Sequence, residues 1–232
     1  MTSPSQDEPQ VRWSELVAFV RQLSHDIRNH LNAAELQAAY LSELAQDAEI
    51  KNEVKRLREM VAEVSKSLQS VTSKMSAITA TRIRYRCADL VEDVKQRLES
   101  STEKPNVQWQ IDLGETAFEV DPQLLQEAFW EIFANAARHA QSGAGPMVAA
   151  ARIDGQQFEF TLREPKKDFQ EPTEKWGFEP LRKISRGHYG LGLNRVRMIV
   201  ELLGGGFTAE YDSRTSSLRS RIVLPLAKPA SG

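Results

Sequence analysis

The chain has 232 residues, of which 41% are hydrophobic and 27% charged, the composition of a folded protein long enough for two compact domains. Its net charge of -2, from 30 basic and 32 acidic residues, excludes the strongly basic surface that nucleic-acid binding requires. The single cysteine, Cys87, excludes an internal disulfide and a cysteine-rich metal site. The N-terminus has no recognisable signal peptide, and no stretch approaches the roughly 18 to 20 apolar residues that span a bilayer. We therefore expect a cytoplasmic protein without a membrane segment.

Two long amphipathic helices are predicted in the first third of the chain. In the first helix, apolar residues recur at steps of three and four. They are Leu16, Val20, Leu23, Ile27, Leu31, Ala34, Ala38 and Leu41. A second series alternates steps of four and three, as in the seam of a coiled coil. It consists of Ile50, Val54, Leu57, Val61, Val64, Leu68, Val71, Met75 and Ile78.

The connection between these helices predicts how they are arranged. Residues 45–47 are too few to do more than reverse the chain, so the two helices should form an antiparallel hairpin. A lone hairpin cannot bury both apolar stripes. Two copies would bury them in a four-helix bundle, so we expect a homodimer.

The other face of the first helix carries a histidine among polar residues. His25, Arg28, Asn29 and Asn32 are three or four positions apart and lie opposite the apolar stripe. An exposed imidazole can act as a nucleophile near neutral pH, and Asp26 is placed to orient it or to accept its proton. On helical spacing alone, an ordinary surface histidine is the simpler interpretation.

The residues around this histidine resemble a known motif. Residues 23–31 resemble the H-box of sensor histidine kinases, which lies on the first helix of their dimerisation domain. The resemblance implies that His25 is the phosphoacceptor, that Asp26 assists phosphoryl transfer, and that Asn29 positions water for dephosphorylating the partner. His30 stands where the family usually has a proline that bends the helix, so a straighter helix is expected here.

After Thr81 the pattern changes to short alternating apolar runs typical of strands. Asp121 and Pro122 form a good helix start, and a second helix is predicted from about Leu191 to the glycines that begin at Gly204. Strands are expected at 107–111, 118–120, 147–153, 157–162, 207–211 and 219–224. These elements predict an α/β sandwich, with helices on one face of a mixed sheet, and an α+β fold for the whole chain.

The helix that follows Pro122 contains a polar row. Glu131 and Asn135 share one face, and His139 lies one turn further on. Magnesium prefers hard oxygen ligands and keeps several waters while it bridges phosphates, so one amide oxygen from Asn135 would suffice with water and a triphosphate. Residues 131–140 resemble the N-box of the kinase ATP-binding domain, which implies that Asn135 is the magnesium ligand and that the cofactor is ATP.

A glycine-rich turn precedes the last predicted helix. Gly190 and Gly192 allow close approach of backbone amides to a ligand, and the helix N-terminus that contains Leu193 favours an anion. Residues 187–195 resemble the G2 box, and residues 176–181 resemble the F-box that begins the lid over the nucleotide. Three basic residues after the F-box are expected to face phosphates: Arg182, Lys183 and Arg186.

One motif of the family is altered. Its G1 box has an aspartate that reads the adenine amino group, followed by two glycines, directly after the strand predicted at 157–162. Here only Glu164 can replace the aspartate, and neither glycine is present. A carboxylate one methylene too long, next to the rigid Pro165, should weaken a pocket that is built to hydrogen-bond its substrate.

The resemblance spans residues 16–226 and implies a domain order. We expect a disordered N-terminus (1–12), a dimerisation and histidine phosphotransfer domain (13–80), a GHKL-type ATP-binding domain (81–228) and a tail (229–232). The implied function is a cytoplasmic, sensor-less histidine kinase. It would autophosphorylate His25 with ATP and magnesium and pass the phosphoryl group to an aspartate of a response-regulator receiver domain.

Two other functions remain open on the sequence. The first is a histidine phosphotransferase that relays phosphate between receiver domains without ATP, and the second is a non-catalytic dimeric scaffold. The altered G1 box favours the phosphotransferase, whereas the retained N-box and G2 box favour the kinase.

Overall fold

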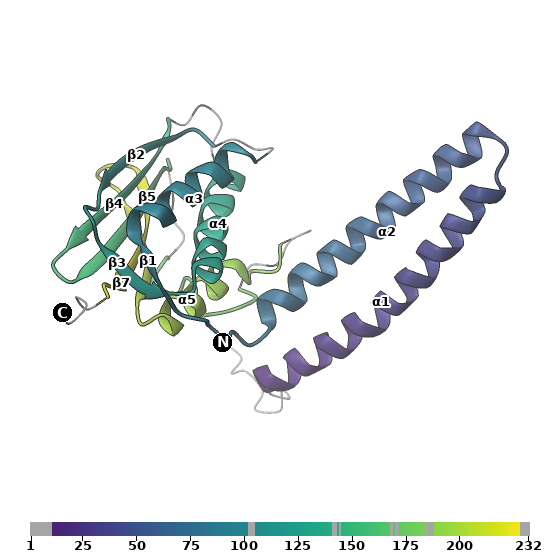
Figure 1. Ribbon diagram of the computed structural model, residues 1–232, viewed down its shortest axis with the longest axis horizontal. Helices are drawn as coiled ribbons and strands as arrows, with labels where there is room; N and C mark the ends of the chain where they lie inside the picture. The colour runs from purple at the N-terminus through teal and green to yellow at the C-terminus, as the bar shows by residue number, and fades with distance from the viewer. Residues whose placement is uncertain are drawn as a thin grey trace, which may run out of the picture. The chain divides into compact units, whose positions relative to one another are not determined.

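The structure is a computed structural model, and it divides into two compact units, Met1–Ser76 and Ala77–Gly232 (Figure 1). It describes residues 11–101, 105–140, 143, 145–167, 169, 172–182, 184 and 188–227. Lys183 and Arg186, residues 1–10 and the expected tail lie outside the described residues. None of the helices within the described ranges combines the length and the apolar composition needed to cross a lipid bilayer.

The first unit is the predicted antiparallel helical hairpin. It consists of α1 (Trp13–Leu44) and α2 (Ala48–Met75). Asp47 caps α2 by accepting a hydrogen bond from the backbone N–H of Glu49 at 2.6 Å. Arg58 reaches across from α2 to Glu35 on α1, with an N–O distance of 2.7 Å, as expected for helices that run in opposite directions. The prediction of the hairpin is therefore confirmed.

The heptad seam of α2 is only half covered within the single chain. Every seventh residue from Val54 is buried or half-buried, in the series Val54, Val61, Leu68 and Met75. Three of the alternate positions stay open, because Ile50, Leu57 and Val64 are 55%, 43% and 47% exposed, whereas the next one, Val71, is half-buried. On α1, Leu23 and Leu41 of the predicted stripe are also exposed. A single hairpin thus leaves a continuous apolar strip on its surface.

The second unit is built on a five-stranded mixed sheet with the strand order β2-β4-β5-β7-β6. Its strands are β2 (Val107–Asp112), β4 (Met147–Asp154), β5 (Gln157–Pro165), β6 (Gly206–Asp212) and β7 (Ser217–Pro225). Only β2 and β4 pair in parallel, and the other neighbours pair antiparallel. A separate two-stranded sheet pairs β1 (Ile83–Arg86) with β3 (Ala117–Val120). The fold class predicted from the sequence is confirmed.

Three helices of this unit pack on one face of the large sheet: α3 (Cys87–Glu99), α4 (Pro122–Arg138) and α5 (Gly192–Leu202) (Figure 1). Alternate residues of β5 point into the core between sheet and helices. Phe160 of β5 meets Phe129 of α4, with ring centroids 4.5 Å apart, and Phe133 at 6.0 Å. This aromatic packing fixes α4, and with it the predicted polar row, against the sheet.

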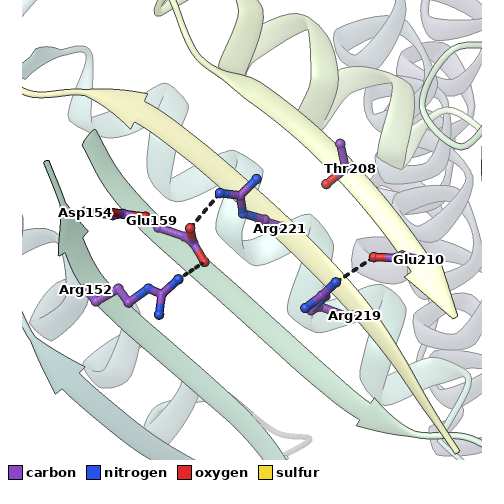
Figure 2. Close-up of a pocket in the computed structure, with 7 residues that line it drawn as sticks. All are labelled: Arg152, Asp154, Glu159, Thr208, Glu210, Arg219 and Arg221. Carbon is purple, nitrogen blue, oxygen red and sulfur yellow. Dashed lines mark hydrogen bonds and ion pairs between the residues drawn. The ribbon is translucent and has the colours of Figure 1, made fainter. Parts of the chain in front are cut away.

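The opposite face of the sheet carries a ladder of ion pairs (Figure 2). Glu159 on β5 accepts hydrogen bonds from Arg152 on β4 at 3.1 Å and from Arg221 on β7 at 2.6 Å. Arg219 donates to Glu210 at 2.6 Å. The hydrogen bond from Arg221 lowers the pKa of Glu159 below its usual value. Because these cations are matched by carboxylates across the strands, the ladder is best explained as stabilisation of a solvent-facing sheet.

Candidate functional site

His25 lies in the middle of α1 with its side chain exposed. The imidazole is 67% exposed and the Asp26 carboxylate 54% exposed. Nδ1 of His25 lies 3.2 Å from Oδ1 of Asp26 and 3.5 Å from Nδ2 of Asn29. Gln22, one turn earlier, donates to the same Oδ1 at 2.9 Å and holds the carboxylate in place. The structure therefore brings together the three residues predicted from the H-box.

The shorter of these contacts favours one tautomer of a neutral imidazole. A carboxylate only accepts hydrogen bonds, so the contact at 3.2 Å places the proton on Nδ1, where Asp26 accepts it, and the longer contact with Nδ2 of Asn29 is then not a hydrogen bond. Nε2 is then left with a lone pair. Helix α1 continues without a break through His30, because no proline removes a backbone donor there. His25 therefore has regular helix on both sides.

In the second unit, α4 begins as predicted. The side chain of Asp121 accepts hydrogen bonds from the backbone N–H groups of Gln123 and Leu124, both at 3.1 Å, and Pro122 is the first helical residue. Glu131 and Asn135 are half-buried on the helix, and His139 is its C-cap residue. The polar row thus runs along the last two turns of α4.

The glycine-rich turn approaches this row at the start of α5. A Cβ added at Gly192 would come within 2.5 Å of Oε2 of Glu131, so any other residue here would require the Glu131 side chain to move. Gly190 has a φ of 64°, in the left-handed region. A buried Arg195, with Nε 3.0 Å from Glu127 on α4, ties the two helices together. Leu193 packs against the hydrophobic core.

The G1 position holds a buried ion pair. Glu164 and Lys166 are only 3% and 6% exposed, and Nζ of Lys166 lies 3.5 Å from Oε2 of Glu164. The same Nζ donates a hydrogen bond to the carbonyl oxygen of His139 at the end of α4. Burial raises the pKa of the Glu164 carboxyl, and the Lys166 ammonium opposes that shift. The carboxylate expected to read a base is therefore already bound to a cation of the chain itself.

Sequence reasoning missed Lys166, although a signal was present. Residues 158, 160, 162, 164 and 166 are all buried, so the alternation of β5 continues past its apolar part. The predicted strand stopped at 162 because Glu164 and Lys166 are charged. Their burial becomes possible only because each neutralises the other.

The F-box segment is attached to α5. Asn194 donates to the carbonyl oxygen of Gly177 at 2.9 Å, and a Cβ on Gly177 would lie 2.9 Å from the carbonyl oxygen of Leu193. The guanidinium of Arg197 lies over the ring of Phe178, 3.4 Å from its centroid. Arg182 donates to the carbonyl oxygen of Pro172 at 3.4 Å.

The residues of the second unit fit a nucleotide in part. Asn135 offers one amide oxygen beside Glu131, which is suited to a hydrated magnesium ion but not to a metal held by protein ligands alone. Among the described residues, no three His, Cys, Asp or Glu side chains cluster closely enough to hold a metal ion by themselves. The residues at the G1 position do not fit, since Glu164 and Lys166 already satisfy each other there.

Comparison with known proteins identifies the second unit. Residues 120–228 match the family of histidine kinase-, DNA gyrase B- and HSP90-like ATPases. No curated protein sequence matches the chain. The family resemblance read from the N-box and the G2 box is thereby confirmed.

Solved structures extend the likeness to the fold of both units. Full-length ShkA, crystallised with AMPPNP, is 19% identical with a TM-score of 0.70, over 92% of this chain and 47% of ShkA. The histidine kinase ThkA, in complex with the response regulator TrrA, is 16% identical with a TM-score of 0.60, over 92% of this chain and 63% of that one. The mycobacterial sensor histidine kinase MprB is 18% identical with a TM-score of 0.51, over 64% of this chain and 100% of that one. The chain therefore has the fold of sensor histidine kinases and spans about half the length of ShkA.

Proposed function

We propose that this chain is a dimeric histidine kinase in which His25 carries a phosphoryl group and passes it to an aspartate of a response regulator. The observation that supports it best is the contact between Nδ1 of His25 and the Asp26 carboxylate at 3.2 Å on an exposed helix face. The ATPase-family match of residues 120–228 supports a kinase. The complex of ThkA with TrrA motivates the choice of partner.

The three polar residues have distinct roles in this proposal. Asp26 holds the proton on Nδ1, so Nε2 is the nucleophile that forms a P–N bond while the P–O bond of the donor breaks. The ring becomes positively charged, and the Asp26 carboxylate stabilises that charge. A carboxylate oxygen of the receiver aspartate then attacks the phosphorus and returns the electron pair to Nε2. Asn29 positions the water that removes phosphate from the partner.

ATP is the proposed donor, and magnesium held in part by Asn135 would supply charge neutralisation for its phosphates. On the same helix, the Glu127–Arg195 ion pair links α4 to α5, and Glu131 lies close to Gly192. The expected cytoplasmic location remains a prediction.

A second candidate is a phosphotransferase that charges His25 from another receiver domain without ATP. The buried pair of Glu164 and Lys166 favours it, because that pair occupies the position from which the base would be read. A non-catalytic scaffold remains the third possibility, although it has no need of an oriented imidazole.

Phosphorylation assays separate these candidates. The purified protein is incubated with γ-labelled ATP and magnesium, and separately with a labelled, phosphorylated receiver domain. Acid-labile, base-stable label from ATP is the expected result. If label comes only from the receiver, the protein is the phosphotransferase relay and not a kinase. If neither donor labels the protein, only the non-catalytic scaffold is left.

Two variants test the assignment of the site. His25→Gln should abolish labelling, whereas His30→Gln, a matched change at an exposed histidine five residues later on α1, should retain it. Asp26→Asn should lower the rate of labelling by about 100-fold, because an amide cannot stabilise the charged ring. Equal labelling of His25→Gln and the unmodified protein would show that the phosphosite lies elsewhere.

The homodimer is proposed from the exposed half of the heptad seam. Val64→Glu places a charge in the strip formed by Ile50, Leu57 and Val64 and should convert the dimer to a monomer in light scattering. Ser70→Glu, on the opposite side of α2, is the matched control and should remain dimeric. A monomeric unmodified protein at micromolar concentration would exclude the dimer.

A further inference from the structure

The loop after β5 places an ammonium group between two residues assigned to the nucleotide. Nζ of Lys166 contacts the carboxylate of Glu164 at 3.5 Å and donates to the carbonyl oxygen of His139. Both lysine and glutamate are almost fully buried. Lys166 thus joins the end of β5, at the G1 position, to the end of α4, the helix that carries the N-box residues.

We propose that Lys166 is an internal competitor of the nucleotide base, bound to Glu164 in its place, so that a purine reaches this carboxylate only by displacing the lysine side chain. This inference rests on the proposed function only in taking ATP as the phosphoryl donor. It assigns to Lys166 a regulatory role in nucleotide affinity.

The chemistry of the two competitors is alike. An exocyclic amino group of a purine is a hydrogen-bond donor, and Glu164 is the carboxylate that the G1 resemblance assigns to it. An ammonium group is also only a donor, but it carries a full charge and three N–H bonds. In a buried site a charge-assisted bond to a carboxylate is stronger than a neutral one. Lys166 therefore outcompetes a base amino group of equal geometry.

The lysine backbone is fixed, so its competition ends only when the side chain moves. The backbone N–H of Lys166 donates to the carbonyl oxygen of Ser216 at 2.8 Å, and its carbonyl oxygen accepts from the Tyr211 hydroxyl at 3.1 Å. The Tyr211 ring in turn packs on Phe169, with centroids 5.3 Å apart. By contrast, the four-carbon stem of a lysine rotates readily. The backbone of the loop is thus held in place, and the side chain of Lys166 is the part that can move.

An ordinary structural ion pair makes a different prediction from a competitor. If the pair only stabilises the fold, its removal lowers stability and leaves nucleotide affinity unchanged or weaker. If Lys166 competes, its removal strengthens binding even though the fold is less stable. Nucleotide affinity is therefore the discriminating measurement.

The first experiment measures binding of ADP with magnesium by calorimetry. Lys166→Ala and Lys166→Met should both bind at least about 10-fold more tightly than the unmodified protein, since each removes the competing donor. Lys167→Ala is the matched control, an identical change at the next, exposed lysine, and should stay within about 2-fold. Lys166→Met keeps the volume of the side chain and serves where the alanine variant fails to fold.

A second experiment needs no variant. Reductive methylation of the unmodified protein, followed by mass spectrometry, should leave the buried Lys166 protected, with exposed Lys167 as internal reference. Saturating ADP with magnesium should increase methylation of Lys166 at least about 5-fold by releasing its side chain. Protection that persists while ADP is bound would overturn the proposal.

Failure of this inference is distinguishable from failure of the proposed function. Lys166 variants that bind ADP no more tightly than Lys167→Ala, including the case in which none of them binds, would overturn the competitor role. Labelling of His25 is a separate readout. Tight ADP binding by Lys166→Ala without label on His25 would support the competitor and refute the kinase.

Discussion

The buried pair of Glu164 and Lys166 makes a quantitative prediction about stability. Lys166→Met removes the charge and keeps the approximate length of the side chain, leaving Glu164 buried without its cation. The least costly response of Glu164 is to bind a proton. For an ordinary carboxyl pKa of about 4.3, that proton costs about 4 kcal/mol at pH 7 and about 1 kcal/mol at pH 5. Loss of the hydrogen bond to His139 adds about 1 kcal/mol at either pH.

The free energy of unfolding should therefore fall by about 3 to 5 kcal/mol at pH 7 but by only about 1 to 2 kcal/mol at pH 5. The sign follows from the raised pKa of Glu164. A carboxyl whose pKa is raised by folding contributes stability below its ordinary pKa and loses it as the pH rises through the folded value. Without Lys166 that pKa rises further, so the loss between pH 5 and pH 7 becomes steeper.

Urea unfolding followed by circular dichroism at both pH values measures this difference. Lys167→Met, at an exposed neighbour, should change stability by less than about 0.5 kcal/mol at either pH. Adding Glu164→Gln to Lys166→Met should remove the pH dependence. A loss for Lys166→Met that is the same at pH 5 and pH 7 would show that Glu164 does not become protonated and would refute the reasoning.

Three further predictions concern other parts of the second unit. The Asp93 carboxylate accepts a hydrogen bond from the Tyr85 phenol and raises its pKa to about 12. The stability from this bond is present below about pH 10 and lost as the pH rises through about 12, so Tyr85→Phe should cost about 1 kcal/mol at pH 8 and weaken the alkaline dependence seen in urea unfolding. The pKa of Glu159 is lowered, chiefly by Arg221, so Glu159→Gln should cost about 1 to 2 kcal/mol at pH 7, and this difference should disappear as the pH falls from the ordinary carboxyl pKa through the lower pKa of the folded state. Burial raises the pKa of the Cys87 thiol, so a thiol reagent should modify it only as fast as the unit opens, a rate that stopped-flow absorbance measures.

Local patterns made part of the fold predictable. The start of α4 follows from Asp121 and Pro122, whose cap and fixed φ act within a few residues. The hairpin of α1 and α2 follows from apolar periodicity. By contrast, β1 and α3 were missed. The strand has only 4 residues, and α3 begins directly after it at Cys87, with an N-cap residue, Arg86, whose side chain makes no capping bond. The helical spacing of the apolar residues Leu90, Val91, Val94 and Leu98 was a local signal for α3 that the prediction did not use.

The candidate sites divide in the same way. His25, Asp26 and Asn29 are neighbours on one turn of a helix, so their spacing predicts their contacts. Lys166 meets His139 only because β5 and α4 pack together, and no short-range pattern encodes that packing. A charged residue after an apolar strand is ordinarily exposed, and its burial depends on partners far along the chain.

This separation bears on the proposed phosphorylation of His25. The orientation of the imidazole depends on Gln22, Asp26 and Asn29, each within about one turn of His25 along α1. In the proposed function, recognition of a base would depend instead on the loop after β5, where Lys166 binds Glu164. A change in that loop would therefore alter the affinity for a nucleotide without altering the proposed nucleophile. The proposed kinase and the alternative relay would differ at this loop, while transfer from His25 to a receiver aspartate would require the same geometry in both.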